Sequence, residues 1–530
     1  MKIRASGTFM LKKIFKIKLK LVGIVLVGLI AIQVISAYFF GVMAEKQFDY
    51  QFKQLTNSQF IKVVEYKYTR GWFVSHEHVT IELNNQGLRN LLAVLPVKSA
   101  ESQAASIDGK YQISYNSTIT NGLFAGYLNG SIMPTLAYSK IDLVLPDSLN
   151  KVLATFFKDE KPLEISTILY PNKAGKYSIY SPKFNYEEAL SGVKVSWGGL
   201  KLNVSFNDEF NRFKTNLDVP YFNLSAPTKG DFAINSATYN SSSERSVNDI
   251  KVGDASFQLA SVKVNLTESD LVNFKLGEII RTVTGINSVD FLNDIDVINP
   301  TQMTLTNAYY KSHSEDVNNY FSADVLAGFE SLNSVKSSYG PLELNFALKH
   351  IRADKFSAIA DLLSYEASLT ESERTADKPR MIAELKKLMT PLLIESPVAE
   401  LNKLTLKVPS GMIAVNGMIT TNNFESADME DQTLFMSKIN ANVHLSVPKP
   451  VLSYLLLMQM KYFLSAGNAE LDAQSSQALS QLVNILLENQ LKVWLKKGYM
   501  TQESDSALST NIQFESGVIY LNKIPTSMND

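Results

Sequence analysis

The sequence contains no cysteine among its 530 residues. That absence excludes disulfide bonds, cysteine nucleophiles and thiolate metal sites. A chain of this length can bury enough apolar surface to fold without disulfides. Histidine is scarce as well, with five residues in the chain, so few side chains are candidates for a histidine-based metal site.

The sequence also lacks the common catalytic motifs. It has no G-x-S-x-G, no G-x-x-x-x-G-K, no G-x-G-x-x-G and no H-E-x-x-H. We therefore expect a protein without catalytic residues, cofactor or metal, although an active site dispersed along the chain would leave no motif.

Charged residues are missing from Leu21 to Ala44. Only Gln33 and Ser36 interrupt this run with polar side chains. About 20 apolar residues in a helix cross the roughly 30 Å hydrocarbon core of a bilayer. The run therefore predicts a transmembrane helix at residues 21–44.

The segment before this run is basic. Basic residues close to a span stay in the cytoplasm, so residues 1–20 are predicted to be a cytoplasmic tail and residues 45–530 to be exported. The exported part carries 44 basic and 52 acidic residues. The seven basic residues of the tail are Lys2, Arg4, Lys12, Lys13, Lys16, Lys18 and Lys20.

A cleaved signal peptide ending at Ala44 is the alternative to a retained anchor. The apolar part of a signal peptide usually has about 7–15 residues. The run here is longer, so we favour the retained anchor. A start at Met10 would preserve the basic flank from Lys12 onward.

The exported part shows the periodicities of strands and of amphipathic helices. Apolar residues alternate on both sides of Pro409-Ser410-Gly411 and of Ser516-Gly517, which predicts two β-hairpins. Helical spacing occurs at residues 88–95, 149–157, 356–363 and 479–495. The polar segment 370–379 is predicted to be a surface loop or a weak boundary. The predicted fold class is α+β: a transmembrane helix, then a mainly antiparallel β-rich part with amphipathic helices packed on the sheets.

The segment from residue 66 to residue 83 predicts another hairpin. Val64, Tyr66 and Tyr68 alternate before Arg70-Gly71, and a second strand follows. We expect a turn with Gly71 at positive φ and with Trp72 or Phe73 buried. His76 and His78 lie on one face of the second strand, but two imidazoles alone do not form a metal site.

The order of these features resembles the YdgA-like family of bacterial envelope proteins. After the basic tail and apolar span, the segment 68–75 is similar to the family pattern Tyr-x-Arg-Gly-x-Phe-x-Ser; its matching residues are Tyr68, Arg70, Gly71, Phe73 and Ser75, with Trp72 between them. The segment Asn121-Gly122-Leu123-Phe124 stands where members show His-Gly-Pro-Phe, and the closing hairpin is also similar. The resemblance implies a single-pass inner-membrane protein of Gram-negative bacteria, with a periplasmic domain at residues 45–530 and no assigned reaction.

These features favour a non-enzymatic protein that acts through its surface. The exported part is expected to bind a lipid or another apolar ligand, an envelope protein or a second copy of the chain. It is expected to form one unit or two units that meet between residues 290 and 350. The acidic exported part has no basic stripe, which argues against nucleic acid. An envelope hydrolase is the alternative: a cluster of Ser, Asp and His would favour it, and a continuous apolar surface would favour binding.

Overall fold

The computed structural model describes residues 32–53, 61–83, 111–127, 133–145, 147–158, 160–267, 302–335, 337–369, 371–465, 473–504 and 506–526. Within them the protein is α+β and dominated by antiparallel sheet, because every strand pairing with a defined register is antiparallel. None of the described helices is both long enough and apolar enough to cross a membrane. The predicted anchor at 21–44 lies partly outside the described residues.

The chain divides into two compact units that are interleaved in sequence. Unit 1 contains residues 1–83, 111–181 and 202–213, and unit 2 contains residues 84–110, 182–201 and 214–530. The residues from 302 to 352, around the boundary expected from the sequence, form consecutive paired strands inside unit 2.

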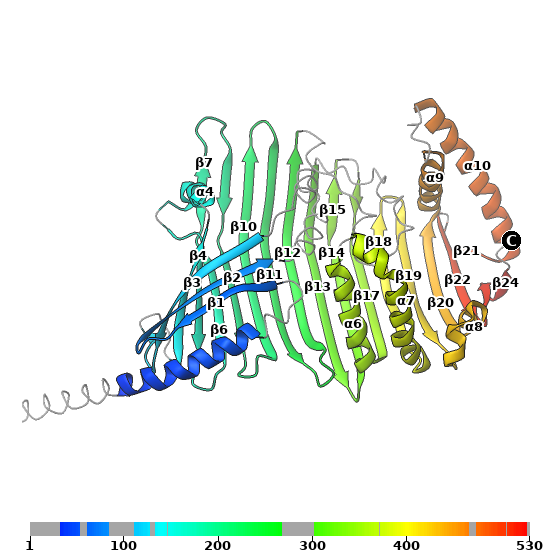
Figure 1. Cartoon of the computed structure of the whole chain (residues 1–530). Coiled ribbons are helices and arrows are strands. Elements are labelled where there is room, and N and C mark those ends of the chain that lie inside the picture. The colour runs from blue at the N-terminus through cyan, green and yellow to red at the C-terminus, as the bar shows by residue number, and fades with distance from the viewer. Residues whose placement is uncertain are drawn as a thin grey trace, which may run out of the picture. The chain divides into compact units, whose positions relative to one another are not determined.

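Unit 1 is an antiparallel meander against which one helix packs (Figure 1). The helix covers residues 32–53. Its core combines Ala44 and Phe48 of the helix with Ile119, Leu136 and Leu169 of the sheet. The strands are β1 (Ile61–Thr69), β2 (Val74–Leu83), β3 (Tyr111–Asn121), β4 (Ala137–Val144), β5 (Glu164–Leu169), β6 (Gly175–Ser181) and β9 (Leu200–Phe206); the helix α4 (Asp147–Phe157) follows β4.

Unit 2 is a longer antiparallel sheet whose strands follow each other mostly in chain order (Figure 1). Its strands are β7 (Phe184–Glu187), β8 (Lys194–Trp197), β10 (Arg212–Ala226), β11 (Gly230–Arg245), β12 (Lys251–Leu266), β13 (Gln302–Val317), β14 (Tyr320–Phe329), β15 (Ser331–Ser334), β16 (Ser338–Tyr339), β17 (Leu342–Arg352), β18 (Val398–Val408), β19 (Gly411–Thr421), β20 (Ile439–Pro448), β21 (Thr501–Gln502), β22 (Ala507–Glu515), β23 (Val518–Leu521) and β24 (Ile524–Thr526).

The described helices of unit 2 lie on its sheet or beyond its ends. α6 and α7 are side by side over the strands around β17 (Figure 1), where Phe356 of α6 stacks on Phe321 of β14. α9 and α10 pack together near β20 and β22, with Leu487 and Leu491 buried beside Leu508. The helices are α6 (Ala353–Ser368), α7 (Glu371–Ile394), η4 (Ser426–Met429), α8 (Gln432–Ser437), α9 (Lys449–Ser465) and α10 (Ala473–Lys497).

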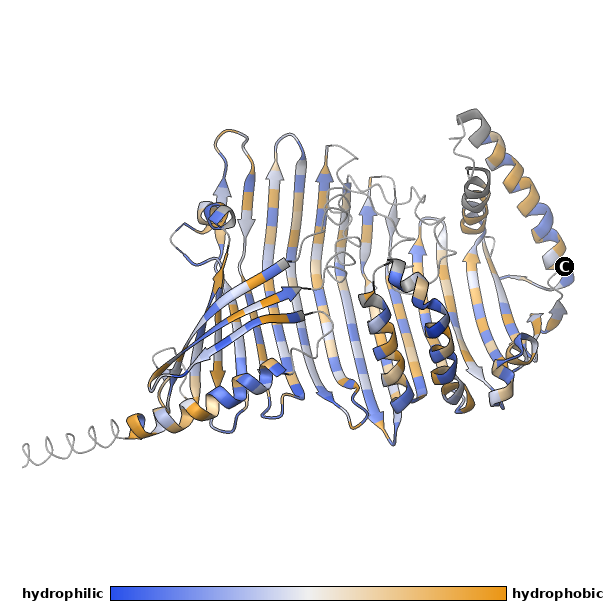
Figure 2. Cartoon of the chain, viewed as in Figure 1, coloured by the Kyte–Doolittle hydropathy of each residue, from blue (hydrophilic) through white to orange (hydrophobic). Residues whose placement is uncertain are grey.

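Hydrophobic and hydrophilic residues alternate along the strands of unit 2, as Figure 2 shows. Strand β17 is the clearest case, because Leu342, Leu344, Phe346 and Leu348 alternate with polar or small residues. Successive side chains of a strand point to opposite faces of the sheet. The sheet of unit 2 therefore has one apolar face and one mainly polar face.

On three neighbouring strands, the apolar residues change between odd-numbered and even-numbered positions at one row of residues. Ser236 of β11 and Asn307 of β13 both have positive φ, at 48°. Ala260 of β12 lies between them, since the flanking residues pair in continuous register. On β12, the apolar residues nearest this row occupy odd positions before it (Phe257, Leu259) and even positions after it (Val262, Val264).

Most elements predicted from periodicity are present. The hairpins at Gly411 and at Ser516-Gly517 are confirmed as β18–β19 and β22–β23, and the helices predicted at 149–157, 356–363 and 479–495 are confirmed as α4, α6 and α10. The surface loop predicted at 370–379 is wrong, because α7 begins at Glu371 and continues through Pro379. The helix predicted at 88–95 lies outside the described residues.

Candidate functional site

The sequence motif around Arg70 forms the turn between β1 and β2, as predicted. The two strands pair from Ile61 with Leu83 to Thr69 with His76. The prediction that Trp72 or Phe73 is buried is wrong: their exposed fractions are 54% and 46%. The turn therefore presents both aromatic side chains on the surface, while Ser75, next in the motif, is completely buried.

Gly71 is required by close packing and not by its φ angle. Positive φ was predicted, but Gly71 is not among the glycines with positive φ. A Cβ atom at Gly71 would lie 2.0 Å from the carbonyl oxygen of Val74. Because that oxygen belongs to the backbone, any side chain at position 71 would force the turn to move.

The second motif, at residues 121–124, lies directly against this turn. The side-chain amide of Asn121 donates hydrogen bonds to Ser75 Oγ at 2.9 Å and to the carbonyl oxygen of Gly71 at 3.4 Å. Its backbone N–H donates to the carbonyl oxygen of Phe73 at 2.8 Å. Asn121 is fully buried and thus joins two turns that lie 50 residues apart in the sequence.

The helix at residues 32–53 contacts both turns through its polar side chains. Gln33 accepts a hydrogen bond from the backbone N–H of Phe124 at 3.1 Å, and Ser36 accepts one from that of Leu123 at 3.2 Å. The indole of Trp72 donates to the carbonyl oxygen of Val34 at 3.1 Å. The two polar residues of the predicted anchor therefore hold the second motif.

Two further contacts fix the next turns of this helix. Arg70 forms an ion pair with Glu45 at 2.8 Å. The hydroxyl of Tyr66 donates to Asp49 at 2.5 Å. Arg70 of the motif and Tyr66, two residues before it, thus bind the helix, a role that the sequence did not indicate.

Glu77 is a buried carboxyl group two residues beyond the motif, with an exposed fraction of 4%. Its Oε1 atom has no hydrogen-bond partner among the described residues. Burial raises the pKa of Glu77 to about 7, although the hydroxyl of Ser117 on the neighbouring strand lowers it. Burial also raises the pKa of Tyr68 to about 12.

The two histidines next to the motif are not brought together with further ligands. His78 Nδ1 lies 2.8 Å from Asn116 Oδ1, and the His76 side chain is exposed. Among the described residues, no group of three His, Asp or Glu side chains has the geometry to hold a metal ion.

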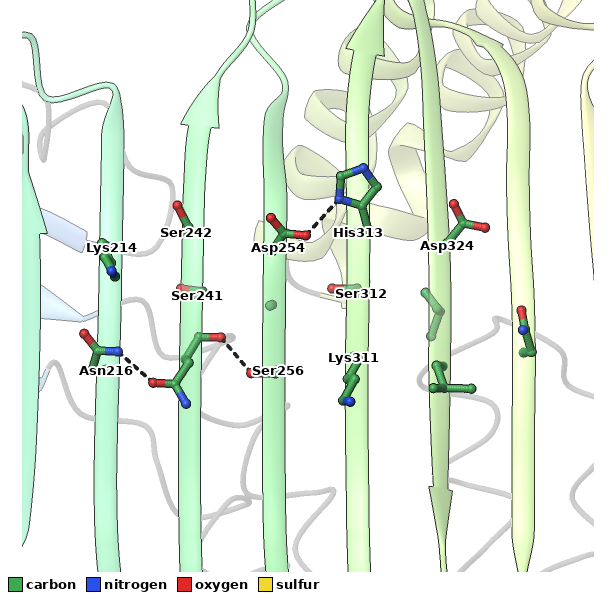
Figure 3. A pocket seen from close by; sticks show the side chains of 15 residues that line it. Lys214, Asn216, Ser241, Ser242, Asp254, Ser256, Lys311, Ser312, His313 and Asp324 are labelled. Atoms are coloured by element: carbon green, nitrogen blue, oxygen red, sulfur yellow. Dashed lines mark hydrogen bonds and ion pairs between the residues drawn. The ribbon is translucent and has the colours of Figure 1, made fainter.

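The polar face of unit 2 contains an open hollow of about 550 Å³, lined by strands β10 to β17 (Figure 3). His313 Nδ1 lies 2.8 Å from Asp254 Oδ1 on the neighbouring strand, and this contact raises the pKa of His313. Asp324 lies on the other side of His313. The hollow also contains Lys214 and Lys311, so its charges are of both signs.

This hollow does not bring Ser242 within reach of His313. Ser242 pairs with Asp254, and Asp254 pairs with His313, so Ser242 is two strands from His313. Strands are about 4.8 Å apart, which places the two residues roughly 10 Å from each other. A nucleophile and its base need to be within about 3 Å. The Asp254–His313 pair is therefore not joined with Ser242 into the triad that a serine hydrolase uses.

The apolar face of unit 2 carries a continuous row across many strands. Paired residues follow each other from Tyr239 on β11 to Leu445 on β20. The members of this row are half-buried or, in the case of Tyr310, exposed, whereas Ile119 and Leu169 in the core of unit 1 are completely buried. The row is Tyr239, Phe257, Tyr310, Ala327, Leu344, Leu404, Val415 and Leu445.

These features define a β-rich protein with a broad apolar sheet face and a helix held by two sequence motifs. A family model covering residues 17–528 matches the chain, and the chain belongs to this family, which is described as a bacterial protein of unknown function (DUF945). No curated protein and no solved structure matches the chain.

Proposed function

We propose that the protein is a single-pass inner-membrane protein whose periplasmic part binds an apolar ligand, a lipid above all, on the apolar face of unit 2. The observation that carries the proposal is the continuous row from Tyr239 to Leu445, whose members are half-buried except for the exposed Tyr310. Contiguous apolar surface that stays partly exposed often marks a binding surface in soluble proteins. A membrane anchor would keep that surface where lipids are concentrated.

The packing of the helix at residues 32–53 supports a retained N-terminal segment. Ala37 and Ala44 are completely buried against the sheet of unit 1, and Phe48 is 5% exposed. Cleavage after Ala44 would divide this helix in the middle. It would also remove Gln33 and Ser36, which bind the second motif.

We therefore expect the mature protein to keep the residues before Glu45. N-terminal sequencing of protein extracted from membranes should begin at Met1 or Met10. A mature N-terminus at Glu45 would contradict the retained anchor, because the helix contacts of Gln33 and Ser36 would then be missing from the mature protein.

A photo-crosslinking amino acid offers a direct test of the apolar face. Leu404 and Thr405 are neighbours on β18, and their side chains point to opposite faces of the sheet. We expect a crosslinker at position 404 in the full chain, activated in cells, to give several-fold more lipid adduct than the same crosslinker at position 405. Mass spectrometry of the labelled peptides measures both yields.

Equal yields at positions 404 and 405, or no adduct at either, would contradict lipid binding by this face. A protein adduct at position 404 would show that the face is covered by an envelope partner or a second copy.

A further inference from the structure

Unit 1 exposes a compact group of apolar side chains where its helix begins. We call it the aromatic patch, and it consists of Ile35, Tyr38, Phe39, Trp72, Phe73 and Phe124. All six are exposed, from 40% for Phe124 to 61% for Phe39. They come from the helix at residues 32–53, from the β1–β2 turn and from the turn after β3.

Four members of the aromatic patch are held in place by specific contacts. The ring of Tyr38 lies 5.1 Å from that of Trp72 and 5.7 Å from that of Phe39. Trp72 is fixed by its hydrogen bond to Val34, and Phe124 by the bond from its N–H to Gln33. The patch is thus a built surface, fixed by the same contacts that join the two motifs to the helix.

The exposed stripe of the helix changes character along its length. Ile32, Ile35 and Phe39 are exposed at its beginning, and Lys46, Tyr50 and Lys53 are exposed in its later turns. Figure 2 shows the same change, from orange at the start of the helix to more blue toward its end. A helix on the surface of a soluble protein exposes polar residues along its whole length. The first turns of this helix therefore meet a different environment from the later ones.

The sequence before the helix identifies that environment. The uncharged run begins at Leu21, and about 20 residues at 1.5 Å each cross a bilayer core. For the anchor proposed above, a span of about 20 residues from Leu21 would place the outer edge of the core near Phe40. Trp and Tyr are enriched at this level of membrane proteins because their rings are partly apolar and partly polar. Tyr38 lies two residues before that edge, and its ring is 5.1 Å from that of Trp72.

We propose that the aromatic patch embeds unit 1 in the periplasmic interface of the bilayer, where the headgroups meet the acyl chains, so that unit 1 docks on the membrane in addition to being tethered by its anchor. This inference rests on the membrane anchor proposed above. Both motifs then have a common role: they carry Trp72, Phe73 and Phe124 and bind the helix that leaves the bilayer. The ion pair of Arg70 with Glu45 and the exposed Lys46 mark the side facing water.

Tryptophan fluorescence can measure the depth of the patch in the full chain. The chain has three tryptophans, at positions 72, 197 and 494, so Trp197→Phe with Trp494→Phe leaves Trp72 alone. This chain is reconstituted into phosphatidylcholine vesicles with or without bromine on the acyl chains. We expect brominated lipid to quench at least half of the Trp72 emission.

The matched control carries its only tryptophan at position 50 (Tyr50→Trp with Trp72→Phe, Trp197→Phe and Trp494→Phe). Tyr50 is exposed on the same stripe of the helix, beyond Lys46. Position 50 is 11 residues beyond Phe39, about 16 Å along a helix, so its emission should be quenched several-fold less. Equal melting curves for the two chains show that both are folded.

Flotation of the same vesicles separates the two proposals. If the protein floats with the vesicles but Trp72 is quenched no more than the tryptophan at position 50 of the control, the docking proposal is overturned and the anchor is left intact. Protein that fails to float would overturn the anchor and the docking surface together. Trp72 that resists both brominated lipid and aqueous acrylamide would show that a protein covers the patch, which also overturns bilayer docking.

Discussion

Replacing Gly71 by valine is expected to lower the free energy of unfolding of unit 1 by about 3 kcal/mol, as forced overpacking at a fixed backbone does. The added Cβ would lie 2.0 Å from the carbonyl oxygen of Val74. The turn cannot open freely, since Asn121 binds the carbonyl oxygen of Gly71 and the N–H of Gly71 donates to Ser75 Oγ. A shift at residue 71 therefore disturbs buried hydrogen bonds as well.

Urea denaturation followed by the fluorescence of Trp72, as the only tryptophan, measures this change in the full chain. Arg70→Ala is the matched control at the neighbouring position. It removes a partly exposed ion pair with Glu45, and such pairs contribute about 0–1 kcal/mol. An unfolding midpoint for Gly71→Val equal to that of Arg70→Ala would show that the turn relaxes without cost.

The stability of unit 1 is expected to fall as pH rises from 4.5 to about 7, because of Glu77. Its folded pKa is raised to about 7 from an ordinary value of 4.5. Below pH 4.5 the carboxyl is neutral in both states and carries no penalty. Above pH 7 it is charged in both states, and the folded state holds that charge in a buried position. The shift corresponds to about 3 kcal/mol of lost stability.

Glu77→Gln separates this effect from the other titrating groups. The glutamine side chain has nearly the same shape and no charge, so the pH-dependent loss attributed to Glu77 should disappear. The measured quantity is the difference in unfolding free energy between about pH 5 and about pH 8, in the wild type and in the variant. The same difference in both proteins would mean that Glu77 reaches solvent or a partner in solution.

The sequence predicted those elements whose signals are local. Alternating residues and turn residues located the hairpins at Gly71, Gly411 and Gly517, and helical spacing located α4, α6 and α10. The α+β class with antiparallel sheet follows from the same periodicities. These signals depend on neighbouring residues, so they are visible without knowledge of the fold. Segment 371–379 was missed because its polar residues and Pro379 were interpreted as a loop, whereas α7 accommodates that proline.

The site was harder to predict because it depends on contacts between distant segments. Trp72 is an aromatic residue beside a turn, and an aromatic side chain is usually taken as part of the core. Its exposed position is explained only by its contacts with Val34 and Tyr38 of the helix. Glu77 lies between Ser75 and Val79 on the buried face of β2, yet the sequence does not show that one of its carboxyl oxygens, Oε1, has no hydrogen-bond partner among the described residues. The one local signal for this site is that Gln33 and Ser36 are the two polar residues that interrupt the apolar run.

The row of Ser236, Ala260 and Asn307 has a consequence for how unit 2 reaches its native pairing. Strands of 16 residues can slip along each other, and a slip of one residue exchanges the two faces of a strand. Serine and asparagine at positive φ occupy the row where the alternation changes. In a slipped pairing, those residues would no longer lie opposite Ala260, and apolar side chains would meet polar ones on both sides of the row. The row therefore favours the native register over pairings shifted by one residue.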